Sequence, residues 1–318
     1  MMTQRGPLLV ILGPTATGKT PVAVEVALLA GGEVVSADSM LIYKYMDIGT
    51  AKPTLQERRG VPHHLIDVVA PDEEFSVAHY QKMAGETIKG IISRAKLPIL
   101  AGGTGLYIQA VVDGYKFGKV GIDNELREEL KEYARLHGRI ALHERLKEID
   151  PETAFRLHPN DQKRVIRALE IYHKTGKPLS SYNDNREKTM YNLCMIGLYM
   201  PRDQLYERVD RRVDKMLNEG LVQEVDGLLQ AGYDTDLVSM QGLGYKEIAA
   251  YLKGEIDFER AVYLIKRDTR RFAKRQLTWF RRDPRIQWID VNEYPGARGI
   301  ASEIITKAEG VTRGVSKV

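Results

Sequence analysis

The chain of 318 residues contains a single cysteine, Cys194, and this scarcity excludes an internal disulfide and any zinc site built from several cysteines. Such cysteine usage fits a reducing cytoplasm. Cys194 lies in the apolar run Asn192–Ile196, where a buried strand residue is favoured over a reactive thiol.

Long hydrophobic runs are also missing. The apolar run Leu8–Leu12 is too short for a signal peptide or a membrane span, so we expect a soluble, cytoplasmic protein. The net charge of +4 is too small to indicate a nucleic-acid partner by itself, so the distribution of basic residues along the chain is more informative about such a partner. A hydrophobic content of 43% in a chain of this length supports a substantial core in one large domain or two.

The run Leu8–Leu12 is followed by GPTATGKT and then by the helix-like stretch Val22–Leu29. Strand, glycine loop and helix with the spacing G-x-x-x-x-G-K-T indicate a P-loop. Its backbone N–H groups and the helix N-terminus bind a phosphate, while Lys19 reaches a phosphate oxygen and Thr20 a bound Mg²⁺. The predicted phosphate-binding residues are Gly13, Pro14, Thr15, Ala16, Thr17, Gly18, Lys19 and Thr20.

An acidic residue is missing where a nucleotide hydrolase or kinase usually carries one to hold Mg²⁺. The strand-like run Leu97–Ala101 ends in Gly102–Gly105, without a carboxylate. The earlier strand-like run 32–39 does end in an acid, Asp38. We therefore predict that a parallel strand neighbouring the P-loop strand delivers Asp38 beside the phosphate loop.

Residues 7 to 112 alternate strand-like and helix-like runs, a pattern typical of a parallel sheet covered by helices. Apolar alternation stops at 114–121, charged helical patterns follow, and a strand-like run resumes at 193–199. We predict an α/β fold: a P-loop NTPase-like parallel sheet core flanked by helices, with an inserted all-helical domain. The core comprises residues 1–114 and 193–318, and the insertion residues 115–192.

Two further features leave alternatives open. His63 and His64 lie in the short strand-like run 62–68, but neighbouring strand side chains point to opposite faces, so structural hydrogen bonds are favoured over metal ligation. The glycine turn Gly103–Gly105 precedes a helix, and it is consistent either with substrate binding or with a tight connection.

Basic residues recur at helical spacing in two segments. Arg164 and Arg167 share a helix face, which is either a solvated surface or a grip on phosphates. Arg208 and Arg212 lie one turn apart and could point at one anionic target.

The segment 260–282 is strongly basic, with Lys or Arg at 266, 270 and 274 and at 267 and 271 along one helix. Such a helix favours a polyanion, with an affinity that falls steeply with salt. Its Trp279 either stacks on a base or packs in the core, which is the commoner place for tryptophan.

Taken in order, the segments GPTATGKT, SADSMLIYKYMDIGTAKP, HHLID, AGGTGLY, NDQKRVIRALEIYHKTGKPLS, GLGYKE and KRQLTWFRR resemble bacterial tRNA dimethylallyltransferases over residues 7 to 290. The resemblance implies transfer of a dimethylallyl group from dimethylallyl diphosphate to N6 of adenosine 37 in tRNAs that read codons beginning with U. The P-loop would then hold the diphosphate of a prenyl donor, with no ATP hydrolysed. Eukaryotic relatives carry a C-terminal zinc finger, and the absence of a cysteine pair here favours the bacterial form.

The resemblance also implies roles for individual residues. Lys19 and Thr20, with Mg²⁺, would stabilise the leaving pyrophosphate, and Asp38 would accept the proton of N6. Thr104 and Arg212 would contact the diphosphate. The residues implied to contact tRNA are Asp38, Ser39, Met40, Leu41, Thr104, Gln162, Lys163, Arg164, Val165, Ile166, Arg167, Lys274, Arg275, Gln276, Thr278, Trp279 and Arg281.

The partners implied are the anticodon stem-loop of tRNA and dimethylallyl diphosphate, with no membrane, and a monomeric enzyme is expected. The chain departs from the family at Pro21, directly after the P-loop threonine, where relatives usually have another residue. Proline is tolerated in a first helical turn, so we expect the loop to survive.

Three other functions compete with this interpretation. An adenylate isopentenyltransferase would perform the same chemistry on free AMP or ATP, but it has no need of the basic KRQLTWFRR segment. A small-molecule kinase is disfavoured by the missing carboxylate after Leu97–Ala101. A non-catalytic RNA-binding module would leave the P-loop and Asp38 without a role.

Overall fold

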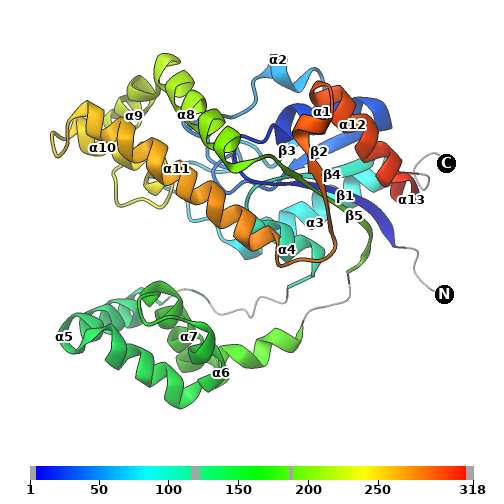
Figure 1. The fold of residues 1–318 in the computed structure, drawn as a ribbon. Helices are drawn as coiled ribbons and strands as arrows, with labels where there is room; N and C mark the ends of the chain where they lie inside the picture. Colours follow the sequence, from blue (N-terminus) through cyan, green and yellow to red (C-terminus); the bar gives the residue numbers. More distant parts are fainter. Residues whose placement is uncertain (1–4, 116–120, 122, 186–188, 313–318) are drawn as a thin grey trace. The chain divides into compact units, whose positions relative to one another are not determined.

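The computed structural model describes residues 5–115, 121, 123–185 and 189–312 (Figure 1). Within these residues, parallel strands form one six-stranded sheet in the order β3-β2-β4-β1-β5-β6. This arrangement confirms the predicted parallel sheet. The strands are β1 (Gly6–Leu12), β2 (Gly32–Ser36), β3 (His63–His64), β4 (Leu97–Gly102), β5 (Tyr191–Tyr199) and β6 (Ile286–Asp290).

Helices cover both faces of the sheet, as the strand β1 illustrates. Leu9 and Ile11 pack with α1 and α12, whereas Leu8 and Val10 pack with α3 and α4 on the opposite face. Burial on both faces explains why the central strands are continuous apolar runs. The helices are α1 (Lys19–Ala30), α2 (Leu55–Arg58), α3 (Val77–Ser93), α4 (Gly105–Val112), α5 (Asn124–Ile149), α6 (Pro151–Arg156), α7 (Gln162–Thr175), α8 (Arg202–Asn218), α9 (Leu221–Gln230), α10 (Tyr245–Leu252), α11 (Phe258–Phe280), α12 (Gly296–Lys307) and α13 (Glu309–Thr312).

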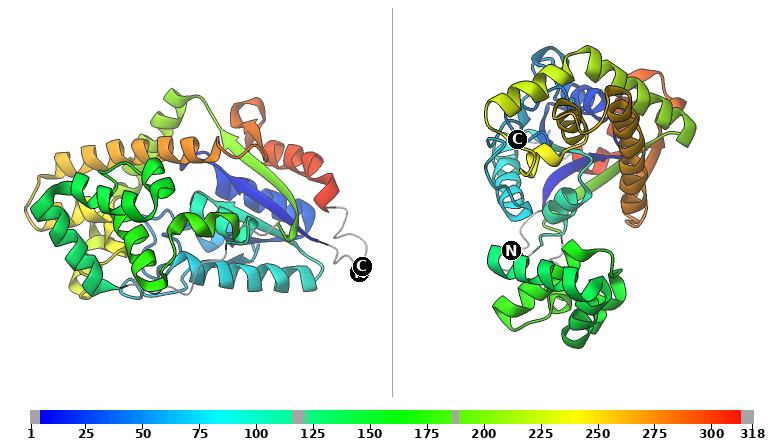
Figure 2. Two further views of the ribbon diagram at one scale, coloured as in Figure 1. Left: turned by 90° about the horizontal axis from the view of Figure 1, so that it is seen from below. Right: turned by 90° about the vertical axis from the view of Figure 1, so that its left-hand side faces the viewer.

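Helices α8 to α11 form a separate group at one end of the sheet (Figure 1). Their apolar cluster includes Val213, Val225 and Ile265, and it also takes in Ile42 and Met46 from the loop after β2. Figure 2 shows α11 as one long helix extending from this group back to the sheet. The packing therefore holds the loop after β2 between the sheet and the helical group.

The third strand is shorter than the sequence predicted. A strand was expected over 62–68, but β3 contains only His63 and His64. Leu65 and Asp67 adopt positive φ angles of 60° and 57°, which extended backbone cannot accommodate. The strand therefore ends where the chain turns toward Val68 and Val69, which donate to Ile42 O.

The chain divides into two compact units, residues 1–112 with 189–318, and residues 113–188. The second unit, called here the helical unit, contains α5, α6 and α7 around the buried Leu142, Leu146 and Val165. Helix α5 is interrupted at Gly138 (φ 89°, ψ 157°), where the sequence predicted a break. In the described part of the chain, none of the helices is both long and apolar enough to cross a membrane.

Candidate active site

The P-loop connects the end of β1 to the start of α1, as the glycine spacing predicted. Gly13 has a φ of 147°, and a Cβ there would lie 2.5 Å from Leu198 O, so only glycine fits. Thr17 Oγ1 donates to Pro14 O at 2.8 Å and closes the loop on itself. The N-cap of α1 is Gly18, which has no side chain to occupy the first helical N–H groups. These groups are therefore left to an anionic ligand.

Two cationic side chains and one carboxylate converge on this loop. Lys19 Nζ donates to Pro14 O at 2.8 Å. Burial and, to a smaller extent, the nearby charge of Arg212 lower the pKa of Lys19 to about 7, while the charge of Asp38 opposes the shift. Burial also lowers the pKa of Arg212, against the charges of Asp38 and Glu57. Two neighbouring cations in a desolvated site are unfavourable by themselves, and a diphosphate would neutralise both.

Asp38 reaches the P-loop by a route that the sequence did not predict. Its strand β2 is not adjacent to β1, because β4 lies between them. Ala37 N donates to Ala101 O at 2.8 Å, and Thr104 N donates to Ala37 O at 3.0 Å. A Cβ on Gly102 would lie 2.2 Å from Ala37 O, so this glycine permits the close approach. The ends of β2 and β4 together therefore place Asp38.

A short hydrogen-bond network fixes the residues after Asp38. Asp38 Oδ1 accepts from Met40 N at 2.9 Å, and in the described part of the chain Oδ2 accepts no hydrogen bond. Thr104 Oγ1 accepts from Ser39 N at 3.0 Å and donates to Ser39 Oγ at 3.3 Å. Thr104 thus positions Ser39, while Ser39, Met40 and Leu41 remain half-buried, as the walls of a pocket would be.

Gln276 was predicted to contact RNA, but its side chain points into the protein. It is only 7% exposed. Its Oε1 accepts from Thr15 N at 2.9 Å, and its Nε2 donates to Gly103 O at 2.9 Å. The amide therefore joins the P-loop to the second glycine turn from inside α11. A glutamine in a basic segment gives no indication in the sequence that its side chain joins two loops.

Sequence reasoning also missed two tyrosines near Asp38. Tyr80 donates to Ser36 O at 2.9 Å and stacks on Tyr107 with ring centroids 3.9 Å apart. Burial raises the pKa of both phenols, and the negative charge of Asp38 adds to the shift. Tyr80 belongs to the buried face of α3, and helical spacing alone does not show where its hydroxyl points.

The basic residues of α8 separate into two environments. Arg212 is half-buried beside Lys19, whereas Arg208 is exposed one turn earlier. Along α11, Lys266 pairs with Asp214 at 2.5 Å and Arg270 with Asp210 at 2.5 Å. These two cations bind α8, so the basic stripe available to a polyanion is shorter than predicted. Among the predicted RNA contacts of the C-terminal part, the exposed ones are Lys274, Arg275, Thr278 and Arg281, and the three cations among them form no ion pair with any described residue.

Trp279 lies half-buried against the second glycine turn. Its indole packs on the apolar cluster that contains Tyr107 and Phe280. A Cβ on Gly105 would lie 2.4 Å from its ring, so the glycine makes room for the indole. This is the core packing that the sequence favoured, and a contact of Trp279 with RNA stays a prediction.

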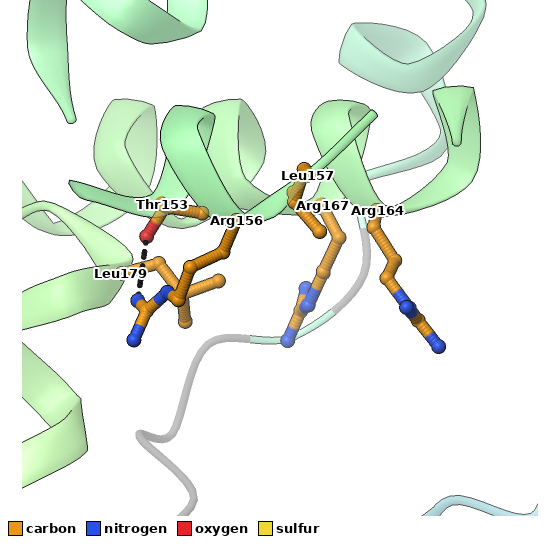
Figure 3. Close-up of a pocket in the computed structure, with 6 residues that line it drawn as sticks. All are labelled: Thr153, Arg156, Leu157, Arg164, Arg167 and Leu179. Atoms are coloured by element: carbon orange, nitrogen blue, oxygen red, sulfur yellow. Dashed lines mark hydrogen bonds between the residues drawn. The ribbon is translucent and has the colours of Figure 1, made fainter. Parts of the chain in front are cut away.

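The helical unit contains a pocket of about 240 Å³ with three arginines on its walls (Figure 3). Arg156, Arg164 and Arg167 extend in the same general direction, and the apolar Leu157 and Leu179 also line the pocket. Arg164 also pairs with Asp161 at 3.1 Å. Such a cluster of guanidinium groups is suited to phosphate.

Two other residues of α7 were predicted to contact RNA, but they are buried. Val165 is 0% and Ile166 is 5% exposed, because both side chains belong to the core of the helical unit. Gln162 is half-buried and Lys163 exposed on the same helix. Phe155, which no pattern in the sequence singled out, is 94% exposed next to Arg156, and an exposed aromatic ring can stack on an unpaired base.

The candidate metal ligands are few. Among the described residues there is no group of three or more histidines, cysteines or acids that could hold an ion. His63 Nδ1 contacts Val61 O at 2.8 Å and His64 Nε2 contacts Glu33 at 2.7 Å, which confirms the structural role favoured for them. Thr20 lies in the first turn of α1, directly after Lys19, and remains the candidate for a Mg²⁺ held mainly by phosphate and water oxygens, the mode this ion favours.

Comparison with known proteins identifies relatives over almost the whole chain. The family model described as IPP transferase matches residues 41–283. A tRNA dimethylallyltransferase of Desulforudis audaxviator is 58% identical over 97% of this chain and 99% of its own length. One from Pelotomaculum thermopropionicum is 52% identical over 97% and 98%.

Solved structures also match almost the whole chain. The full-length tRNA isopentenylpyrophosphate transferase of Bacillus halodurans has a TM-score of 0.73 and 45% identity, covering 99% of each chain. A eukaryotic dimethylallyltransferase acting on tRNA has a TM-score of 0.78 and 30% identity, over 98% of this chain and 78% of its own. The full-length matches include the P-loop and Asp38, which precede the family-model match.

Proposed function

Because this chain belongs to the IPP transferase family, we propose that it transfers a dimethylallyl group from dimethylallyl diphosphate to N6 of adenosine 37 in tRNAs that read codons beginning with U. The observation that carries this proposal is the convergence of Lys19, Arg212 and Asp38 at the P-loop. The two cations can bind a diphosphate, and the carboxylate can accept a proton from an amino group. All three side chains lie in one site.

The donor side of the reaction uses the P-loop. The N–H groups at the start of α1, with Lys19 and Arg212, bind the diphosphate and stabilise the charge that develops as the C–O bond breaks. Preorganised donors of this kind are usually among the largest catalytic contributions. Thr20 would hold Mg²⁺, which supplies further neutralisation of the diphosphate. Its hydroxyl makes no hydrogen bond with the described residues, so it is available to an ion.

On the acceptor side, Asp38 Oδ2 accepts the proton that N6 loses as the N6–C bond forms. An adenine amino group is a poor nucleophile, because its lone pair is delocalised into the ring. Oδ1 is already held by Met40 N, so the carboxylate has a fixed orientation. Ser39, Met40 and Leu41 line the base site, and Thr104 holds Ser39 in place.

Adenosine 37 is stacked in the anticodon loop, so it has to turn out into the site at a cost of roughly a few kcal/mol. Phosphate contacts by the exposed Lys274, Arg275 and Arg281 offset this cost, together with the arginine pocket of the helical unit. Free AMP would need none of these side chains, so tRNA is favoured over a mononucleotide acceptor.

The identity of both substrates is tested by one assay. The protein is incubated with an unmodified anticodon stem-loop and Mg²⁺, and with either dimethylallyl diphosphate or ATP. We expect pyrophosphate release and the mass of one dimethylallyl group on the RNA with the prenyl donor, and no reaction with ATP. Phosphate transfer from ATP, without prenylation, would contradict the proposal. We also propose that the enzyme is a monomer and acts in the cytoplasm, where its tRNA substrate occurs.

Donor binding is expected to take up a proton. The pKa of Lys19 is lowered to about 7 in the free protein, so at about pH 8 most of its side chain is neutral. A bound diphosphate favours the charged form, so it raises this pKa and draws a proton from the buffer. Affinity for the donor should therefore fall as the pH rises above about 7, by up to about tenfold per unit for one linked proton.

Calorimetry at about pH 8, in two buffers that differ in ionisation enthalpy, measures this proton directly. Lys19→Arg is the control, since a guanidinium stays charged and should show no uptake. Equal apparent enthalpies in both buffers for the unmodified protein would show that Lys19 does not titrate on binding.

Binding of RNA should lose part of its salt dependence when Lys274 and Arg275 are both replaced by alanine. Two phosphate contacts on a single-stranded loop contribute about 1.4 to the slope of log affinity against log salt. The control, Arg211→Ala with Lys215→Ala, removes the same charge from exposed positions on α8 that pair with Glu207 and Glu219. Fluorescence anisotropy over a salt series compares the two variants, and equal slopes would place the RNA elsewhere.

A further inference from the structure

The loop that follows the base site is held by one carboxylate. Glu224 Oε2 accepts from Asp47 N at 2.9 Å and from Ile48 N at 2.7 Å, and Glu224 Oε1 accepts from Gly49 N at 3.1 Å. Three consecutive backbone N–H groups thus converge on a side chain from α9. This loop belongs to the same connection as Asp38, eleven residues or fewer along the chain.

A buried tyrosine completes the arrangement. Tyr245 is 0% exposed and donates its hydroxyl to Glu224 Oε1 at 2.6 Å. Its ring lies so close to Gly49 that a Cβ there would be 2.4 Å from it. Burial and the neighbouring charge of Glu224 raise the pKa of this phenol, so it remains a donor at every physiological pH. The tyrosine fixes the carboxylate, and the glycine lets the ring approach the loop.

The helical group supports the same loop at its other end. A Cβ on Gly242, in the turn before α10, would lie 2.5 Å from Met40 Cε, so the turn packs on the base-site residue itself. Ile42 and Met46 of the loop share an apolar cluster with Val213 of α8, the residue after Arg212. The loop and the helix carrying Arg212 are therefore parts of one packed unit.

We propose that Glu224, oriented by Tyr245, is a positioning residue that sets the adenine-lining wall Ser39–Leu41 against Asp38 and Arg212. The inference rests on the proposed function. Glu224 touches neither substrate in this account, and it acts through the loop amides 47–49. The hydrogen bonds from the amides 47–49 to Glu224 are called here the clamp. With the clamp intact, N6 is aligned with the proton acceptor Asp38 on one side and with the reacting carbon of the donor on the other. Loss of the clamp lets the wall move, and a displacement of about 1 Å at a reacting centre costs about 100-fold in rate.

The test is Glu224→Gln, which keeps the shape of the side chain but removes its charge and one acceptor oxygen. Hydrogen exchange of the amides at 47–49 should become faster while exchange in β1 and α1 stays unchanged. Turnover on the stem-loop should fall about 10- to 100-fold, whereas the donor dissociation constant should stay within about twofold, because the P-loop is untouched. Tyr245→Phe keeps the three amide bonds and should lower turnover by only about twofold to fivefold.

Asp226→Asn is the matched control, since it removes one charge from the same helix at a carboxylate that bonds only Gln230 among the described residues. It should change neither exchange at 47–49 nor turnover.

If Glu224→Gln keeps normal turnover, or if donor affinity falls in parallel, the positioning role is wrong. Should Glu224→Gln fail to fold, Tyr245→Phe decides instead: a twofold to fivefold loss of turnover with unchanged donor affinity supports the role, and normal turnover contradicts it. If the unmodified protein does not prenylate the stem-loop, the proposed function itself fails, which the wild-type reaction distinguishes from a failure of the clamp.

Discussion

Replacing Asp38 with asparagine is expected to lower turnover on the anticodon stem-loop by about 10²- to 10⁴-fold, the range in which general-base catalysis contributes. Asparagine can still accept the hydrogen bond from Met40 N through its amide oxygen, so the turn after β2 should persist. What is lost is the ability to take the proton from N6. Affinity for the stem-loop should therefore change much less than turnover.

Single-turnover kinetics with saturating donor and RNA measure this step directly, and binding of the stem-loop is measured separately. Asp72→Asn, at an exposed acid in the same unit, serves as the control and should behave as the unmodified protein. Near-normal turnover of Asp38→Asn would remove the proton-acceptor assignment. A loss of RNA binding equal to the loss of turnover would make Asp38 a binding residue instead.

Replacing Arg212 with glutamine is expected to lower kcat/KM by about 10²- to 10³-fold, as removal of one preorganised donor does in other sites that stabilise developing negative charge. The side chain is half-buried next to Lys19, so no solvent cation replaces it. Its loss has a second consequence, because Arg212 contributes to the lowered pKa of Lys19. Lys19 should then hold its proton to higher pH, and proton uptake on donor binding at about pH 8 should decrease.

Arg208→Gln provides a closely matched control. Arg208 is on the same helix, one turn away, but exposed. Steady-state kinetics and the two-buffer calorimetry are measured for both variants. Equal effects of the two substitutions on kcat/KM would mean that Arg212 acts only through the overall charge of α8.

The sequence predicted well those features whose chemical role and backbone conformation are both determined by a short run of neighbouring residues. The P-loop needs glycine at Gly13 and a helix that begins at Lys19, and the residues GPTATGKT with the helix-like stretch after them indicate both. The parallel sheet was predictable because strands buried on both faces are continuous apolar runs. The buried Cys194 followed from the same pattern.

Features that depend on contacts between distant segments were not predictable. The interposition of β4 between β1 and β2 follows from sheet order, which no local pattern encodes. Helical spacing shows that Arg270 and Lys274 share a face of α11, but only the position of Asp210 shows that Arg270 is already paired. Gln276 was assigned to RNA because it lies in the segment KRQLTWFRR of the family resemblance, whereas its partners lie more than 170 residues away in sequence.

The burial of Val165 and Ile166 illustrates a related limit. A motif resemblance assigns a whole segment to RNA binding, but a helix presents only part of its circumference to a ligand. The apolar residues between Arg164 and Arg167 supply the core that holds the arginines in place. A segment can therefore match a binding motif while only some of its side chains reach the ligand.

The reaction proposed for this site is the prenylation of an adenosine within an RNA loop. The most direct measurement is a competition in one tube between an anticodon stem-loop containing A36-A37-A38 and free AMP, with dimethylallyl diphosphate and Mg²⁺, followed by mass spectrometry of both acceptors. We predict that the dimethylallyl group is found on adenosine 37 of the stem-loop and not on AMP. Transfer to AMP with none to the stem-loop would contradict the account and assign the site to a mononucleotide acceptor.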